Sequence, residues 1–236
     1  MKNIYLILFV LFVLLGSCTK KFEEFNTDVK NPATVTGEAL FSKAELSLVD
    51  QTESTDVNLN IFKIMAQYWT ETTYTDEANY NIVTRTIPDN IFQIYYVGNI
   101  TKQGGFLSDF KEAAKLIALE VSQAPGDDAV KANKQAIIEL LNVYSFQNLV
   151  DIFGNVPYSQ ALDITDITPA YDDAATIYQD LLNRVDAALS NLDPASASFG
   201  SADLIYGGDV NKMDKIWQFT EAKVRDNSFG CESCPC

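Results

Sequence analysis

The sequence contains no histidine among its 236 residues, and this absence excludes several kinds of site. Serine and cysteine triads need an imidazole base, and HExxH zinc sites need two histidine ligands. Positive charge is also scarce, because 17 Lys and Arg face 32 Asp and Glu and leave a net charge of -15. Nucleic-acid binding needs clustered Lys and Arg against phosphates, so this balance argues against it. Carboxylate enzymes, ligand-binding modules and structural proteins remain.

Cysteine is rare, with one residue near the start and three at the end of the chain. Cys231, Cys234 and Cys236 have the spacing of a thiolate metal knuckle, but a structural zinc site needs four ligands and no histidine can supply the fourth. We therefore predict no metal there and no cofactor. A calcium site formed by acidic loops stays open, although the spaced EF-hand pattern is absent.

One long apolar run, residues 4–15, begins just inside the N-terminus. It is shorter than the about 20 residues of a membrane-spanning helix, and Lys2 before it is typical of an export signal. The sequence Leu15-Gly16-Ser17-Cys18 has the pattern of a bacterial lipobox. We expect residues 1–17 to be a lipoprotein signal peptide and Cys18 to be acylated and to become the new N-terminus. An ordinary secretory signal is the alternative.

After a polar tether at residues 18–35, hydrophobic residues recur at helical spacing. Residues 173–192 show this most clearly, with Ile177, Leu181 and Val185 at steps of four. No run of alternating strands competes. The sequence therefore predicts an all-α domain of stacked helix hairpins, although no tetratricopeptide consensus is legible. Further helices are predicted at residues 38–49, 59–71, 90–99, 106–121 and 128–152.

Short polar motifs mark where these helices start and stop. The pairs Asp127-Asp128 and Asp172-Asp173 are typical of helix starts, because acidic side chains are favourable at a helix N-terminus. In the segment FGNVPY at residues 153–158, glycine and asparagine tolerate left-handed backbone angles and proline stops a helix. We interpret this motif as a helix end and turn.

An aromatic and polar cluster at residues 68–80 is the candidate ligand-binding site. Sugars present apolar C–H faces that stack on flat rings, and hydroxyls that need polar partners. Helical spacing gives a competing interpretation, in which Tyr68 or Trp69 is a core residue. Arg85 either joins the site or forms a surface ion pair. The predicted ligand-binding residues are Trp69, Tyr68, Tyr74, Asp76, Asn79 and Tyr80.

Four segments carry a resemblance to a known family. They are FEEFNTDVKNPATVT at 22–36, QYWTETTYTDEANY at 67–80, QNLVDIFGNVPYSQAL at 147–162 and YGGDVNK at 206–212. In this combination and order, the chain resembles the SusD/RagB-like family of nutrient-binding outer-membrane lipoproteins, over nearly everything up to Lys212.

The resemblance implies that residues 36–212 form the N-terminal part of a SusD-like helical fold with tetratricopeptide-like pairs. It implies an outer-membrane, lipid-anchored protein that faces the cell surface, and Thr19 after the acylated cysteine agrees with this sorting. The implied partner is a SusC-like TonB-dependent transporter, to which a glycan or other small nutrient is passed without catalysis. Two alternatives remain: a lipid-anchored carboxylate glycoside hydrolase, which needs only two carboxylates at a set separation, and a purely structural helical lipoprotein.

The chain departs from the family after Lys212. Family members are longer and continue with a helix resembling WxKFxNSLKLRL, whereas this chain reads MDKIWQFTEAKVR from Met213. Removing one base from the Met213 codon allows the same DNA to encode WIKFGNSLKLRL. We therefore expect residues 213–236 to be a frameshifted tail on a truncated protein, in which Trp217 and the three cysteines carry no function.

Overall fold

A computed structural model of the chain describes residues 35–83, 85–98, 105–163, 165–166, 168–215 and 217. The chain divides into two units, Met1–Val35 and Thr36–Cys236, and the second unit contains the fold described below. The signal peptide, the tether, Cys18 and the three C-terminal cysteines lie outside the described residues. Within the described part, no helix combines the length and the apolar character needed to cross a membrane.

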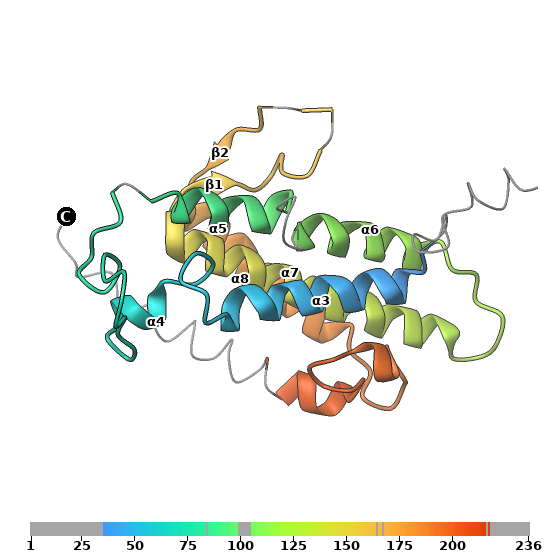
Figure 1. The fold of residues 1–236 in the computed structure, drawn as a ribbon. Helices are drawn as coiled ribbons and strands as arrows, with labels where there is room; N and C mark the ends of the chain where they lie inside the picture. The colour runs from blue at the N-terminus through green and yellow to red at the C-terminus, as the bar shows by residue number, and fades with distance from the viewer. Residues whose placement is uncertain are drawn as a thin grey trace, which may run out of the picture. The chain divides into compact units, whose positions relative to one another are not determined.

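Helices form most of the second unit (Figure 1). Two short strands, β1 (Val156–Pro157) and β2 (Tyr171–Asp172), pair in antiparallel register. The predicted all-α fold is thus confirmed, and the strand pair is a small addition that hydrophobic periodicity does not signal. The remaining elements are α3 (Gly37–Glu53), α4 (Phe62–Met65), α5 (Ile87–Tyr96), α6 (Phe106–Ala118), α7 (Asp127–Phe153), α8 (Ala174–Ser190) and the 3-10 turn η1 (Gly200–Ala202).

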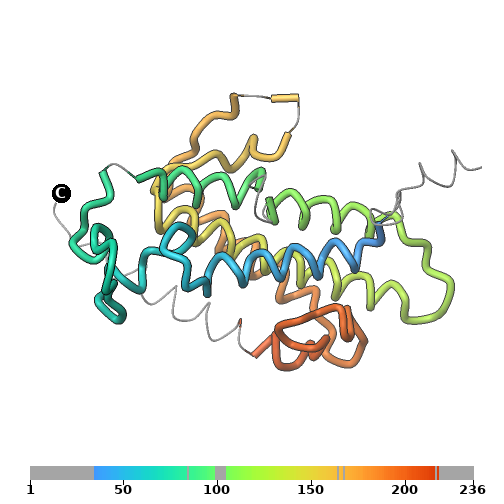
Figure 2. Tube along the Cα trace, viewed as in Figure 1, coloured from blue at the N-terminus to red at the C-terminus, as the bar shows by residue number. Residues whose placement is uncertain are grey.

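The 27-residue helix α7 is the centre of the fold (Figure 2). Helices α6 and α8 both pack against it, and α3 packs mainly on α6. The neighbouring residues Ile137, Ile138, Leu140 and Leu141 point to different sides of α7, yet each is at most 4% exposed. A helix segment that buries apolar residues on several sides belongs in the interior, which explains the place of α7 between the other helices.

Side-chain caps and one glycine define the helix ends. Thr36 Oγ1 accepts the Ala39 N–H at the start of α3, and Asp173 accepts the Thr176 N–H at 3.1 Å at the start of α8. Gly154 ends α7 with φ 73°, as the FGNVPY motif predicted. Asp172 is not a helix cap, because its carboxylate accepts the backbone N–H groups of Tyr158 and Ser159 instead.

Helices α3 and α6 approach closely at their contact. A Cβ atom added to Gly37 would lie 2.7 Å from Ile117 Cγ1 and 3.2 Å from the Ala113 carbonyl oxygen. Glycine at position 37 is therefore what permits the start of α3 to lie against the last turns of α6.

The chain after α8 is fastened back onto the helices by a buried amide. Asn133 of α7 is 0% exposed, and its side-chain nitrogen lies within 3.0–3.2 Å of the carbonyl oxygens of Asp193, Ser196 and Ala197. Its side-chain oxygen accepts the Asp193 N–H. Phe199 then stacks on Phe41 of α3, with ring centroids 3.7 Å apart.

Met213 and Trp217 belong to the core, at 1% and 7% exposure. The Trp217 ring meets the edge of Tyr144 at a centroid distance of 6.5 Å. Residues 210–215 are helical. These two side chains thus pack in the core, although we expected residues 213–236 to be a tail without function. The frameshift stays a prediction.

Two buried carboxyl groups hold the turn after η1. Glu45 of α3, which is 0% exposed, accepts the Leu204 N–H at 2.6 Å and the Ile205 N–H at 3.3 Å. Asp203, at 2% exposure, accepts the N–H groups of Ile205, Tyr206 and Gly208. Burial raises the pKa of Glu45 to about 8, and the neighbouring Asp203 carboxylate adds to the rise.

This raised pKa predicts a stability that falls with pH. Between about pH 4.5 and pH 8 the folded chain keeps a proton on Glu45 that the unfolded chain releases, so raising the pH favours unfolding. Glu45→Gln removes this dependence. We expect the free energy of unfolding, from denaturant titrations at pH 5 to 9, to fall less with pH in the variant than in the wild type. Parallel curves would show that Glu45 does not titrate in this range.

Candidate functional site

The segment between α3 and α5, residues 54–86, carries the predicted aromatic cluster. The sequence predicted a helix over residues 59–71, but the structure contains only the single turn α4. Gln67 has φ 59°, and the N–H groups of Tyr68 and Trp69 both bond back to the Lys63 carbonyl oxygen. A left-handed residue with such bonds ends a helix, so the chain after Met65 runs as a loop.

The aromatic residues of this loop face solvent. Tyr68 and Tyr74 are 82% and 89% exposed, and Trp69 and Tyr80 are about half exposed. The interpretation of Tyr68 or Trp69 as a core residue is therefore wrong. None of the ring-to-ring contacts among the described residues joins two of these four side chains, so they are spread along the loop rather than stacked on one another.

Hydrogen bonds connect the two ends of the segment that contains residues 68–80, which we call the aromatic loop. The Tyr80 hydroxyl donates to the Met65 carbonyl oxygen at 2.9 Å and accepts from Gln67 Nε2 at 3.2 Å. Asp76 and Asn79 lie in a turn between them, where the Asn79 side-chain nitrogen donates to the Thr75 carbonyl oxygen. Tyr80 is thus held at the end of α4, while Asn79 is bonded within its own turn.

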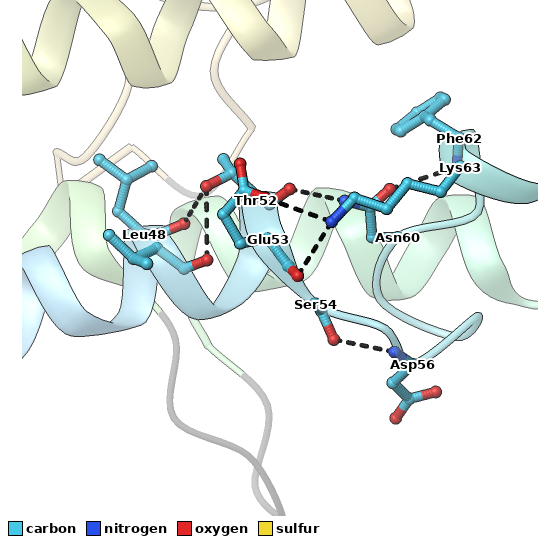
Figure 3. A network of polar contacts seen from close by, with 9 residues as sticks. Leu48, Thr52, Glu53, Ser54, Asp56, Asn60, Phe62 and Lys63 are labelled. Carbon is cyan, nitrogen blue, oxygen red and sulfur yellow. Dashed lines mark hydrogen bonds and ion pairs between the residues drawn. The ribbon is translucent and has the colours of Figure 1, made fainter. Parts of the chain in front are cut away.

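A network at the end of α3 fixes the chain that leads into α4 (Figure 3). Asn60 Nδ2 donates to the Thr52 carbonyl oxygen at 2.7 Å. Lys63 Nζ donates to both the carbonyl oxygen and the carboxylate of Glu53, at 3.1 and 3.2 Å. The same ammonium lies 5.4 Å from the centre of the Trp69 ring. A cation over an indole face is attractive, so Lys63 links the position of Trp69 to α3.

A buried ion pair closes the far side of the loop. Glu77 is only 1% exposed although Asp76 before it faces solvent and Ala78 after it is half-buried, and its carboxylate pairs with the Arg85 guanidinium. Arg85 Nη2 also donates to Asn58 Oδ1 at 2.8 Å. Of the two roles that the sequence allowed for Arg85, ligand binding or an ion pair, the structure shows the ion pair. It connects residues 58, 77 and 85 across the base of the loop.

The backbone of the loop is strained. Gln67, Tyr74 and Tyr80 have φ near 60°, and the described chain has one other non-glycine residue with positive φ, Leu162. Left-handed backbone costs roughly 1–2 kcal/mol for a residue with a Cβ atom. Such strain persists only where the surroundings over-determine it, and it concentrates at functional sites.

The chemistry of the loop suits uncharged, hydroxyl-rich ligands. Its rings offer flat apolar faces, and Asp76 and Asn79 offer oxygen and amide groups for hydroxyls. In the part of the chain that the structure describes, no group of three or more Cys, Asp or Glu side chains is arranged to hold a metal ion. The loop residues thus favour recognition by stacking and hydrogen bonds.

A separate cavity of about 520 Å³ lies between α3, α7 and the turn after η1. Its lining is largely apolar, including Leu48, Leu141 and Ile205, and Trp217 closes one side. Both oxygens of Glu45, which also borders it, accept backbone N–H groups of the turn. Because the chain beyond Trp217 is outside the described residues, we assign no site to this cavity.

Comparison with protein families decides the relationship of the chain. The model of the SusD-like family, described as starch-binding and associating with the outer membrane, matches residues 29–220. The chain belongs to the SusD-like family. The match includes Met213 and Trp217, which agrees with their burial in the SusD-like core.

A solved structure shares the SusD-like fold. It is the crystal structure of a SusD/RagB family protein from Bacteroides thetaiotaomicron VPI-5482, which is 21% identical and superposes with a TM-score of 0.57. The comparison covers 80% of this chain but only 37% of that protein, so the chain spans well under half the length of this relative. No curated protein matches the chain.

The ion pair at the base of the loop yields a stability prediction for this SusD-like chain. Arg85→Met leaves the Glu77 carboxylate buried without its partner, which we expect to cost about 1–3 kcal/mol of unfolding free energy. Hydrogen–deuterium exchange should rise most at residues 70–83. The double variant Glu77→Gln/Arg85→Met should recover most of the loss. Equal exchange in the wild type and in Arg85→Met would show that the pair does not hold the loop.

Proposed function

We propose that this SusD-like chain binds an oligosaccharide through the exposed aromatic rings of residues 68–80. The observation that carries the proposal is the exposure of four aromatic side chains on a loop that polar contacts fasten at both ends. Each of these rings presents an apolar face to solvent, on which the C–H face of a sugar can stack. The same residues are those that the aromatic and polar composition of the segment predicts.

The way in which the loop is held supports binding by preorganisation. Lys63 restrains Trp69, Tyr80 is bonded to Met65, and the Glu77–Arg85 pair closes the base. Rings that are already positioned lose little conformational entropy when a ligand stacks on them. The family description, starch-binding, makes a neutral glucan the first ligand to test.

We propose that a lipid on Cys18 anchors the protein to the outer membrane, where it faces the cell surface. Acyl chains contribute about 0.8 kcal/mol per buried CH₂ group, so several chains on one cysteine anchor a soluble body firmly. We propose that the bound glycan passes to a SusC-like TonB-dependent transporter. The family's association with the outer membrane supports this location.

We propose binding without catalysis. A glycoside hydrolase needs an acid with a raised pKa that reaches its substrate. Glu45 has a raised pKa, but it is 0% exposed and its oxygens accept the N–H groups of Leu204 and Ile205. The neighbouring Asp203 carboxylate likewise accepts the backbone N–H groups of Ile205, Tyr206 and Gly208. These carboxyl groups hold a turn, which favours a structural role over an acid–nucleophile pair.

Trp69→Ala tests the binding proposal. Loss of a stacked indole should weaken glycan binding at least about tenfold, because aromatic anchors dominate such sites. Isothermal titration against neutral oligosaccharides of the α-glucan, β-glucan, xylan and mannan classes measures the affinity. The matched control is Leu119→Ala at the far end of α6, where an apolar side chain is 71% exposed outside the loop.

Unchanged affinity in Trp69→Ala would reject the aromatic loop as the site. Failure of the wild-type chain to bind any of the four glycan classes would favour the purely structural alternative. Release of reducing ends from a bound glycan would instead favour the hydrolase.

Cys18→Ser tests the anchor and the partner together. Cells that express the wild type should incorporate labelled palmitate into the protein, and the variant should not. The wild type purified from outer membranes with mild detergent should carry a TonB-dependent transporter with it. Labelling that persists in Cys18→Ser would place the lipid elsewhere, and purification without any transporter would argue against the delivery step.

A further inference from the structure

A second hollow lies where three elements meet, outside the aromatic loop. Its volume is about 320 Å³, at the lower end of the range for small-ligand pockets. The lining comes from the first turns of α5, the end of α7 with the residues after it, and β2. These residues are Pro88, Asp89, Phe92, Gln93, Phe153, Asn155 and Tyr171.

Aromatic rings form much of the wall of this pocket. Phe92 and Phe153 meet edge to face, with centroids 5.4 Å apart, and both are only partly buried. Tyr171 is 64% exposed on a strand of two residues. Packing in the hydrophobic core therefore does not explain why an aromatic residue lies at this position. Three ring systems on one small concave surface offer stacking faces to a ligand.

The polar groups around the rings indicate which ligand fits. Asp89, Gln93 and Asn155 are all exposed and supply carboxylate and amide groups. Asn155 Oδ1 already accepts the Ala174 N–H at 3.0 Å, which fixes the side chain at the rim. Among the residues that the structure describes, no Lys or Arg lines the pocket. A phosphate or carboxylate ligand would meet Asp89 without a compensating cation, so the lining favours a neutral ligand.

Flat rings beside hydrogen-bonding groups without a cation suit a sugar, whose C–H face stacks and whose hydroxyls bond. We propose that the pocket formed by Phe92, Phe153, Tyr171 and the polar residues Asp89, Gln93 and Asn155 is a second binding site for a neutral sugar ring. This inference rests on the proposed function, because it extends glycan binding to a surface that is distinct from the aromatic loop.

The position of the pocket along the chain fits such an extension. Arg85, which closes the aromatic loop, is three residues before Pro88 at the start of α5. In Figure 1 the loop and the first turn of α5 lie at the same end of the helical body as β1 and β2. A glycan held by the loop is therefore presented at the end of the protein that carries the pocket.

Tyr171 is the residue to change, because its exposure makes the substitution tolerable for the fold. We expect Tyr171→Ala to weaken glycan binding about five- to tenfold, the effect of one aromatic stacking contact. Tyr171→Phe keeps the ring face and should retain most of the affinity. Gln93→Ala, on an exposed side chain of the same pocket, should also weaken binding. Val97→Ala, 77% exposed just beyond α5, is the control outside the pocket.

The decisive experiment combines these changes with Trp69→Ala in titrations of the full chain with the neutral oligosaccharide that the wild type binds most tightly. We expect residual binding in Trp69→Ala, which the added Tyr171→Ala change weakens about five- to tenfold further. If Tyr171→Ala changes the affinity neither of the wild type nor of Trp69→Ala, the second site is wrong, while the aromatic loop can still be the binding site. No binding of any tested glycan by the wild type would overturn the proposed function and this inference together.

Discussion

The burial of the middle of α7 is the constraint on which the rest of the structure depends. The middle of this 27-residue helix buries apolar side chains on several sides, so α6, α8 and α3 must cover it. Its one fully buried amide, Asn133, then fixes the path of the chain after α8. Phe153 at its C-terminal end becomes part of the wall of the second pocket. The central helix thus positions both the other helices and one wall of this pocket.

The aromatic loop differs from the helices, because polar contacts rather than burial of apolar side chains hold it in place. The Arg85 guanidinium pairs with the buried Glu77 carboxylate and so compensates its charge. Lys63 bonds to Glu53 and also lies over the Trp69 ring. This arrangement leaves the rings exposed while the backbone is fixed. A loop that buried its own tyrosines would be more stable, but it would offer nothing for a ligand to stack on.

Periodicity was enough to predict most of the scaffold. Helices α3, α6, α7 and α8 were found from apolar residues at steps of three and four, and the end of α7 was found from Gly154 in the FGNVPY motif. These features are local or depend on a repeated pattern. The predicted helix at 59–71 was wrong because Gln67 takes a left-handed conformation, which nothing in its residue type indicates.

Long-range features were beyond the reach of the sequence. The aromatic composition of residues 68–80 indicated a binding surface, but the burial of Glu77 depends on Arg85 eight residues later. Tyr171 joins Phe92 and Phe153 only through the tertiary fold, and strands of two residues carry no periodic signal. The Glu45 contact with Leu204 spans 159 residues of chain and likewise could not be anticipated.

Amide hydrogen–deuterium exchange of the full chain, measured with and without the oligosaccharide that it binds most tightly, tests the central claim most directly. We expect the ligand to slow exchange at residues 63–83, where the rings and the residues that hold them lie, and to leave exchange in the buried centre of α7 unchanged. Slower exchange confined to residues 204–206 beside the other cavity, with residues 63–83 unaffected, would contradict it.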